Sequence, residues 1–542
     1  MDSRNRNQLI SKLKSDLYDL VIIGGGVTGA GIALDAISRG LKVALIEKGD
    51  FASGTSSKST KLIHGGLRYL KQFDFKLVRE TGSERAIVHR LAPHLVIPEK
   101  MLLPLIKGGS YGRLMTSIGL SIYDYLAKVK SPDRRVMLSK DETVSKEPLL
   151  KDALLRGAGY YAEYRTDDAR LTIELIKKSL SLGAHCINYV RMRDLNFIEG
   201  QIRSIYCQDE LTGEGILIAS KCFVSAAGPW VDEIRAQDGS LTGKQLRLTK
   251  GVHIVLDRHK LPLKQTVYFD VSGGRMIFAI PRQKVTYIGT TDTDYSGDLN
   301  KVEVSKSDAM YLLEAVNATF KNLHLECADI QSSWAGLRPL IHEESKSASQ
   351  VSRKDEIFES PSGLLSIAGG KLTGYRKMAE RIVDLVMMKL KGQKGNCITD
   401  GILLTPNPIE NSQLLISYKK TIDSQLKEWG IQDDYLSEYF VTNYGSQTSD
   451  IFSKIENVSD INNNLVIAEI NFCVKHEIVQ KATDYLIRRT GLMYFDIEKA
   501  KKIYPLVLKT LAEILGWDQK RLEAEKSEVE QAFINLKIRD CT

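Results

Sequence analysis

The clearest pattern of hydrophobic and polar positions lies near the N-terminus, where two apolar runs flank a glycine-rich segment. Leu20 to Ile23 form an apolar run that ends in glycines, and the residues up to Gly40 repeat small and apolar side chains at helical spacing. The stretch LKVALIEKGD then predicts a second buried strand ending at Glu47. The pattern therefore predicts a strand, a glycine loop, a helix and a strand within roughly 30 residues.

The pattern changes near residue 402. Before it, strand-like runs such as MIFAIP alternate with helical ones such as DDARLTIELIKKSL, which is typical of a mixed α/β enzyme. After it, Pro406 and Pro408 mark a linker, and helical periodicity with only four of the 41 glycines predicts an α-helical domain over residues 402–542. The predicted fold class is therefore α/β + α.

Composition and charge narrow the class of protein. The 542 residues are 43% hydrophobic and 26% charged, as in an ordinary folded protein, so we exclude a disordered chain. The net charge of +8 divides into +12 for residues 1–401 and −4 for residues 402–542. A basic body favours anionic partners such as phosphate, lipid or nucleic acid. Nucleic acid is disfavoured, because the basic residues are dispersed and no basic stripe with interleaved aromatic residues is present.

The cysteines and the apolar runs indicate the cellular environment in which the protein is expected to fold. The seven cysteines are scattered without a C-x-x-C pair, so we expect no zinc site, no redox disulfide and no secreted disulfide framework, and a reducing compartment is the simplest inference. The polar first 16 residues lack the apolar run of a signal peptide, and no stretch approaches the roughly 18 apolar residues of a membrane span. We expect a soluble protein or one that lies on a membrane surface.

The glycine loop has the spacing of a dinucleotide-binding turn. Gly24, Gly26 and Gly29 give G-x-G-x-x-G between a strand and a helix, the context that this motif requires. Glu47, at the end of the second strand, can accept hydrogen bonds from ribose hydroxyls. Later segments, KCFVSAAGPW and GLLSIAGGKLTGYRK, could reach a flavin, and no second G-x-G-x-x-G is present for a nicotinamide. The sequence therefore favours an FAD protein.

A set of longer motifs resembles the FAD-dependent, quinone-linked glycerol-3-phosphate dehydrogenase family. They are TSSKSTKLIHGGLRYL, DDARL, AAGPWV, KGVHIV, IGTTDTDY, WAGLRPL, GGKLTGYRKMAE and ATDYLIRRTG. The resemblance implies a glutathione-reductase-like, Rossmann-type FAD-binding domain, a mixed β-sheet substrate cap and a helical C-terminal domain. The FAD-binding domain is expected at about 18–100, 150–235 and 340–401, and the cap at about 100–150 and 236–340.

The resemblance also implies a reaction. It is the oxidation of sn-glycerol 3-phosphate to dihydroxyacetone phosphate by hydride transfer to FAD, with electrons passed to membrane quinone. The protein is expected in the cytoplasm, bound peripherally to the cytoplasmic face of a bacterial inner membrane. A homodimer is compatible with the resemblance. Alternatives are a glycerol-3-phosphate oxidase that uses oxygen, an FAD-dependent amino-acid or 2-hydroxy-acid oxidase, and a flavin-containing membrane-associated scaffold without turnover.

Site residues follow from the positions of these motifs. Removal of the hydroxyl proton requires a proton acceptor, for which His253 is favoured over His64, and Arg338 and Lys371 complete the catalytic set. A phosphate dianion requires clustered cations, and the expected substrate-binding residues are Arg68, Tyr69, Arg338, Arg353 and Lys371. The expected cofactor-binding residues are Gly24, Gly26, Gly29, Glu47, Thr55, Ser56, Ser57, Ser59, Lys61, Leu62, His64, Gly65, Gly66, Ala227, Gly228, Trp230, Gly369, Gly370, Lys371, Leu372 and Thr373.

Two further segments allow more than one interpretation. Asp292, Asp294, Ser296, Gly297 and Glu303 fit a calcium-loop pattern, but the preceding residues are strand-like, so no metal site is expected. Residues 111–130 place Tyr111, Met115, Ile118, Ile122, Leu126 and Val129 on one helical stripe with basic residues nearby. That stripe is typical either of a helix lying on anionic lipid or of one packed into the core.

Overall fold

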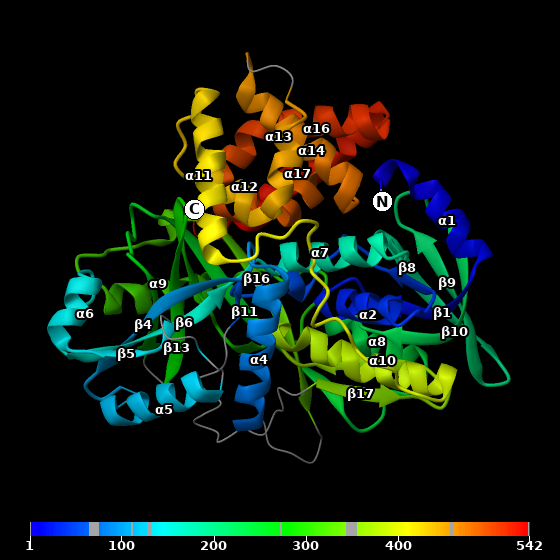
Figure 1. Cartoon of the computed structure of the whole chain (residues 1–542), viewed down its shortest axis with the longest axis horizontal. Coiled ribbons are helices and arrows are strands. Elements are labelled where there is room, and N and C mark those ends of the chain that lie inside the picture. The colour runs from blue at the N-terminus through cyan, green and yellow to red at the C-terminus, as the bar shows by residue number, and fades with distance from the viewer. Residues whose placement is uncertain are drawn as a thin grey trace.

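The computed structural model describes the chain except for residues 1, 64–74, 110–111, 127–128, 130–132, 272–273, 343–354, 456–458, 540 and 542. Figure 1 shows two β-sheets side by side, with the C-terminal helices stacked over them. Predicted residues His64, Gly65, Gly66, Arg68, Tyr69 and Arg353 lie outside the described residues.

The first sheet contains the predicted nucleotide-binding unit. Its strand order is β17-β18-β10-β1-β2-β7, and the neighbours from β18 to β7 run parallel. β1 and β2 have the predicted positions, and their side chains are mostly buried because helices cover the sheet. The strands are β1 Leu17–Ile23, β2 Val43–Ile46, β7 His185–Ile187, β8 Val190–Ile198, β9 Gln201–Asp209, β10 Gly215–Ser225, β17 Asp355–Glu359 and β18 Leu365–Gly369.

Helix α2, Val27–Ser38, follows the glycine loop as predicted and packs between α7, Asp168–Ser181, and α10, Tyr375–Lys391. Its buried positions are mostly glycine, alanine and aliphatic residues, which allow the neighbouring helices to approach closely. The other helices of the body are α1 Arg6–Ser15, α4 Phe75–Leu91, α5 Arg113–Leu126, α6 Lys140–Lys146, α8 Val231–Gln237 and α9 Lys306–Thr319.

The second sheet is larger and mixed, as expected of the substrate cap. Its order is β15-β11-β14-β13-β12-β4-β6-β3, with β16 paired to β11 and β5 paired to β6. β6 lies in this sheet although its residues fall within the range 150–235. The strands are β3 Leu62–Ile63, β4 Ile97–Ile106, β5 Val136–Leu138, β6 Leu155–Arg165, β11 Gln245–Asp257, β12 Thr266–Val271, β13 Arg275–Arg282, β14 Val285–Gly289, β15 Thr293–Asp294 and β16 Ile330–His342.

The C-terminal domain is helical, which confirms the predicted fold class. One hydrophobic cluster runs from its helices into the second sheet and includes Trp334 and Tyr287 from the sheet and Phe495 from the helices. The helices are α11 Ser412–Glu428, α12 Leu436–Tyr444, α13 Thr448–Phe452, α14 Ile461–Glu477, a π-helix Asp484–Arg489, α15 Leu492–Phe495, α16 Ile497–Leu515 and α17 Gln519–Leu536.

The structure contains one disulfide that the spacing of the cysteines did not indicate. Cys327 and Cys541 are bonded, with their Cα atoms 5.3 Å apart, although 214 positions separate them in the sequence. Spacing along the chain could not indicate this pair, because tertiary packing brings the two cysteines together. None of the described helices is long and apolar enough to cross a membrane.

Candidate functional site

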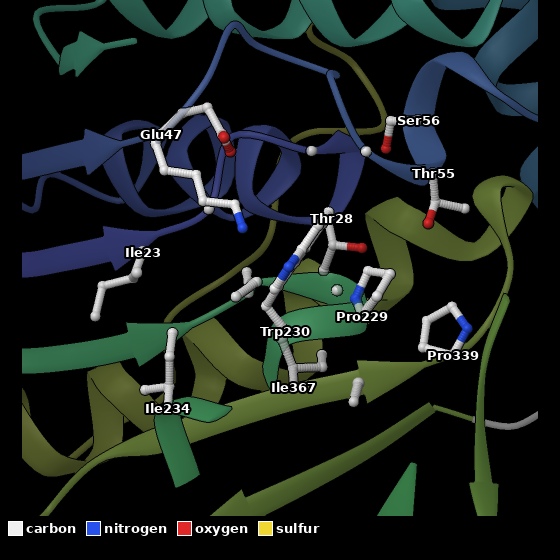
Figure 2. Close-up of a pocket in the computed structure, with 18 of the residues that line it drawn as sticks. Ile23, Thr28, Glu47, Thr55, Ser56, Pro229, Trp230, Ile234, Pro339 and Ile367 are labelled. Atoms are coloured by element: carbon white, nitrogen blue, oxygen red, sulfur yellow. The ribbon is translucent and has the colours of Figure 1, made fainter. Parts of the chain in front are cut away.

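A cavity of about 400 Å³ opens beyond the carboxyl ends of β1, β2, β10 and β18, beside the glycine loop (Figure 2). In open α/β sheets, ligands bind at this edge, where neighbouring strands connect in opposite directions. Here β1 is the branch point, because β2 lies on one side of it and β10 on the other. The cavity therefore lies where a nucleotide would be expected.

The glycine loop can form only with glycine at two of its three positions. Gly24 has φ +115, and a Cβ there would lie 2.6 Å from the carbonyl oxygen of Ala226. A Cβ on Gly29 would lie 1.9 Å from the carbonyl oxygen of Gly24. Gly26 is the N-cap of α2, so the helix begins at the site, where Val27 N–H donates to the Ser56 hydroxyl at 2.9 Å.

The acidic residue at the end of β2 is held by backbone donors. The Glu47 carboxylate accepts hydrogen bonds from Gly25 N–H at 2.7 Å and Gly49 N–H at 2.9 Å. Burial raises the pKa of Glu47, although these two hydrogen bonds act in the opposite direction. Each carboxylate oxygen has a second lone pair, so the fixed group can still accept hydrogen bonds from a ligand in the cavity that it lines.

Most described members of the predicted cofactor set line this cavity. Those on its wall are Gly24, Gly26, Glu47, Thr55, Ser56, Ser59, Ala227, Gly228, Trp230, Gly369, Gly370, Lys371 and Leu372. Among the described residues, the wall does not include Gly29, Ser57, Lys61, Leu62 or Thr373.

Lys61 instead holds a buried ion pair. Its amine contacts the Asp168 carboxylate at 2.5 Å and lies 3.6 Å from Asp167, with 1% of the residue exposed. Asp167 also pairs with Arg282 at 3.1 Å. The Lys61 side chain therefore joins the loop after residue 57 to the start of α7 and to β13, rather than facing the cavity.

The structure adds cavity residues that the sequence did not indicate. Lys48 is one, and its amine lies 3.6 Å from the centre of the Trp230 ring. The others include Val190 to Arg193 at the start of β8, which reach the site because Val190 N–H bonds to Glu47 O at 2.8 Å. Lys48 could have been found from its place directly after Glu47, whereas the β8 segment carries no recognisable motif.

His253, the favoured candidate for the proton acceptor, is buried. His253 on β11 is 1% exposed, its ring stacks on Trp334 with centroids 4.8 Å apart, and its Nε2 lies 3.0 Å from the Thr60 hydroxyl. None of the described residues bonds to Nδ1, and His253 is not in the described cavity wall. Burial lowers the pKa of His253 well below 6.5, and the nearby charges of Arg338 and Lys61 lower it further.

Arg338 on β16 lies next to Pro339, which lines the cavity. Its guanidinium donates to Thr290 Oγ1 at 2.8 Å, Thr291 O at 3.1 Å and Asp292 Oδ1 at 3.2 Å. A Cβ on Gly251 would lie 2.2 Å from the Arg338 Nη2 atom, so glycine there leaves room for the guanidinium.

The calcium-like segment follows a strand, as the sequence predicted. β14 ends at Gly289, and Asp294 pairs with Arg247 while Asp292 pairs with Arg338. Within the described ranges, no group of three or more potential metal ligands is present.

Comparison with protein families matches most of the chain. Residues 19–376 match the FAD-dependent oxidoreductase model DAO, and residues 410–522 match the C-terminal domain of alpha-glycerophosphate oxidase. The chain belongs to the FAD-dependent oxidoreductase family. The prediction of FAD as the cofactor is therefore confirmed.

Individual relatives of this family member extend over nearly the whole chain. An aerobic glycerol-3-phosphate dehydrogenase of Staphylococcus aureus (strain USA300) is 48% identical over 97% of this chain and 96% of its own length. A crystal structure of the Bacillus halodurans glycerol-3-phosphate dehydrogenase with FAD has a TM-score of 0.84 and 39% identity, covering 99% of this chain and 98% of that one. The L-alpha-glycerophosphate oxidase of Mycoplasma pneumoniae shares the fold. Its TM-score is 0.56 and its identity 19%, and the match covers 70% of this chain and 97% of that one.

The residues of this FAD-dependent oxidoreductase fit the cofactor. The glycine loop leaves backbone free to approach a pyrophosphate, because Gly26 has only the Ser56 hydroxyl, 3.1 Å from an added Cβ, as a near neighbour. Glu47 would accept hydrogen bonds from the ribose hydroxyls, and the loop from Gly369 to Leu372 lines the same cavity. Figure 2 shows Glu47 and Thr55 on opposite sides of the opening, which an extended dinucleotide could span.

Proposed function

We propose that this protein oxidises sn-glycerol 3-phosphate to dihydroxyacetone phosphate and passes the electrons to a membrane quinone. The observation that carries the proposal is the 48% identity over 97% of the chain to an aerobic glycerol-3-phosphate dehydrogenase. The match of residues 410–522 to a C-terminal domain named for alpha-glycerophosphate oxidase supports the same substrate.

In this reaction FAD accepts the hydride from C2 of the substrate. The chain must then remove the proton of the C2 hydroxyl, and a neutral imidazole does this well near neutral pH. Because burial lowers the pKa of His253, its ring is neutral before the reaction, and the same burial makes the ring a weaker base. We therefore propose His253 as the proton acceptor, with His64 as the alternative.

The proposed substrate contacts are cationic. Arg338 and Lys371 lie beside the cavity, where Arg338 can hold an oxygen of the substrate with a fork that Thr290 and Asp292 already orient. Arg68 with Tyr69, and Arg353, are proposed to bind the phosphate, whose dianion requires several cations when it leaves water.

The direct test is anaerobic mixing of the FAD-loaded protein with glycerol 3-phosphate. We expect the absorbance of the oxidised flavin to bleach at a rate compatible with turnover, and glycine or lactate at the same concentration to leave it unchanged. Bleaching by an amino acid or a 2-hydroxy acid, but not by glycerol 3-phosphate, would reject the proposal in favour of an oxidase of another substrate.

The electron acceptor distinguishes two candidate functions, a quinone-linked dehydrogenase and an oxidase. The likeness in fold to an L-alpha-glycerophosphate oxidase makes oxygen the second candidate. After anaerobic reduction, a short-chain quinone should reoxidise the flavin much faster than air-saturated buffer does. Peroxide formed at the rate of substrate oxidation would instead indicate an oxidase.

Membrane contact is proposed for helix α5, on the cytoplasmic face of the bacterial inner membrane. The helix buries Thr116, Leu120 and Tyr123. Its other face carries Leu114 (73% exposed), Met115 (71%), Ile118 (46%) and Tyr125 (83%). Met115 and Ile118 of the predicted stripe therefore face outward, whereas Leu126 and Val129 pack against buried Val78 and Tyr123. Exposed Arg113 and Arg134 lie nearby, so an apolar face next to cations fits anionic lipid.

We expect the double substitution Met115→Glu and Ile118→Glu to abolish co-sedimentation with vesicles of anionic phospholipid. Each new carboxylate would have to lose water on entering the interface and would also repel the lipid head groups. The matched control, Leu414→Glu with Ile416→Glu, changes two exposed apolar residues of α11, 49% and 56% exposed, and should retain vesicle binding. Unchanged binding of the α5 variant would place the membrane contact elsewhere.

A further inference from the structure

The turn after β2 has one side on the nucleotide cavity. Glu47 and Lys48 line the cavity, and the Glu47 carboxylate is fixed by the N–H groups of Gly25 and Gly49. The position of this carboxylate therefore depends on the path of the backbone through residues 47–50.

The other side of the same turn is fixed by β8 and its lead-in. Tyr189 N–H donates to Gly49 O at 2.9 Å, and Val190 N–H donates to Glu47 O at 2.8 Å. Asp50 closes the turn with a carboxylate that is 1% exposed and accepts from the Asn188 amide at 3.0 Å. None of these contacts supplies a positive charge for the Asp50 carboxylate, so its counter-ion comes from outside the nucleotide-binding unit.

The neutralising cations come from the C-terminal domain, more than 400 positions away in the sequence. Arg489 donates to both Asp50 oxygens, at 2.6 and 2.9 Å, and Arg488 donates to one of them. Both arginines belong to the π-helix Asp484–Arg489. Consecutive side chains of an α-helix do not face the same neighbour, whereas these two converge on one carboxylate.

The arginines are themselves held in place. Arg489 donates to Glu477 O at 2.7 Å, and Arg488 donates to Asp484 at 2.7 Å. Asp484 also accepts from the Tyr189 hydroxyl at 2.5 Å, so the π-helix contacts residue 189 as well as residue 50. Burial opposes ionisation of Asp50, but Arg489 and Arg488 hold its pKa at about 2. Removal of one arginine would weaken the compensation of a buried charge.

We propose that Arg488 and Arg489 are positioning residues for FAD: through Asp50 they fix the turn 47–50 and so hold Glu47 where the cofactor's ribose binds. The C-terminal domain thereby contributes to cofactor affinity without lining the described cavity. This proposal rests on the FAD-dependent family of the chain and is independent of the substrate assigned above.

The test is the dissociation constant of FAD, measured by fluorescence during titration of the flavin-free protein. Arg488→Gln should weaken FAD binding about tenfold or more, by analogy with the lower end of the loss when an outer-shell partner of a metal ligand is removed. Arg488→Lys keeps a cation near Asp50 and should weaken binding less. Hydrogen exchange of the amides of residues 47–50 in the flavin-free protein should be faster in Arg488→Gln than in the parent.

Two further variants separate positioning from a general loss of folding. Tyr189→Phe removes only the hydroxyl that bonds to Asp484 and keeps the ring, so it should fold and still weaken FAD binding. Lys284→Gln breaks ion pairs to Asp433 and Asp496 that join the second sheet to the same C-terminal domain, and it should leave FAD affinity unchanged.

Parental FAD affinity in folded Arg488→Gln, or in Tyr189→Phe if the arginine variant does not fold, would overturn the proposal. Equal weakening in Lys284→Gln would also overturn it, because docking of the whole domain would then be responsible. Failure of glycerol 3-phosphate to reduce the flavin would reject the proposed substrate and leave these affinities unaffected.

Discussion

Gly29→Ala should yield a protein that is purified almost free of FAD. A Cβ at this position would lie 1.9 Å from the carbonyl oxygen of Gly24, which is backbone and has no rotamer to change. The first turn of α2 must therefore move away from the loop, at a cost of roughly 3 kcal/mol or more, as for severe overpacking. The ratio of flavin to protein absorbance after purification measures the effect.

Two other glycines give a graded control for this prediction. Gly374→Ala should bind FAD normally, because Gly374 has φ −90 and an added Cβ would meet nothing within 4 Å. Gly26→Ala should be intermediate, since its Cβ would lie 3.1 Å from the Ser56 hydroxyl, on the side where a pyrophosphate approaches. Normal flavin content in Gly29→Ala would show that the loop is not held as tightly as these distances require.

Arg338→Ala should lower kcat/KM for glycerol 3-phosphate by roughly 10²–10³, the range found when one preorganised donor to a developing charge is removed. The guanidinium is oriented by Thr290 and Asp292, so the loss would combine weaker binding with poorer orientation of the substrate. Arg338→Lys should recover part of the rate, because it restores the charge but not the planar fork. The rate of flavin reduction in a stopped-flow instrument gives the measurement.

The neighbouring Arg247 provides the matched control. It pairs with Asp294, two positions along the same segment, and is about as exposed as Arg338. Arg247→Ala should retain nearly the full rate of flavin reduction. If Arg338→Ala keeps both its FAD and its kcat/KM, Arg338 is not a substrate contact.

The sequence predicted the nucleotide-binding unit well because its determinants are local. The run Leu20 to Ile23, the three glycines and Glu47 lie within one strand–helix–strand unit, and each constrains its immediate neighbours. The strand before Asp292 and Asp294 was predicted for the same reason, since the residues of β14 are strand-like in their own sequence.

What the sequence could not predict depends on distant segments. Lys61 lies in one of the motifs of the predicted cofactor set, but its amine forms ion pairs with Asp168 and Asp167. Only the tertiary structure brings these three residues together. Val190 is held at the cavity by a backbone hydrogen bond to Glu47. Such a bond does not depend on the type of side chain, so the sequence does not reveal it. The outward direction of Met115 on α5 likewise depends on which helical face the second sheet covers.

The hydrophobic cluster that runs from the C-terminal helices into the second sheet has a consequence for how the molecule unfolds. Trp334 and Tyr287 pack against Phe495 across the boundary that composition marks at residue 402. A chain ended at that boundary would expose this cluster to water and lose the packing partners of Trp334. We therefore expect the two regions to unfold as a single cooperative unit, although residues 402–411 link them as separate segments of the sequence.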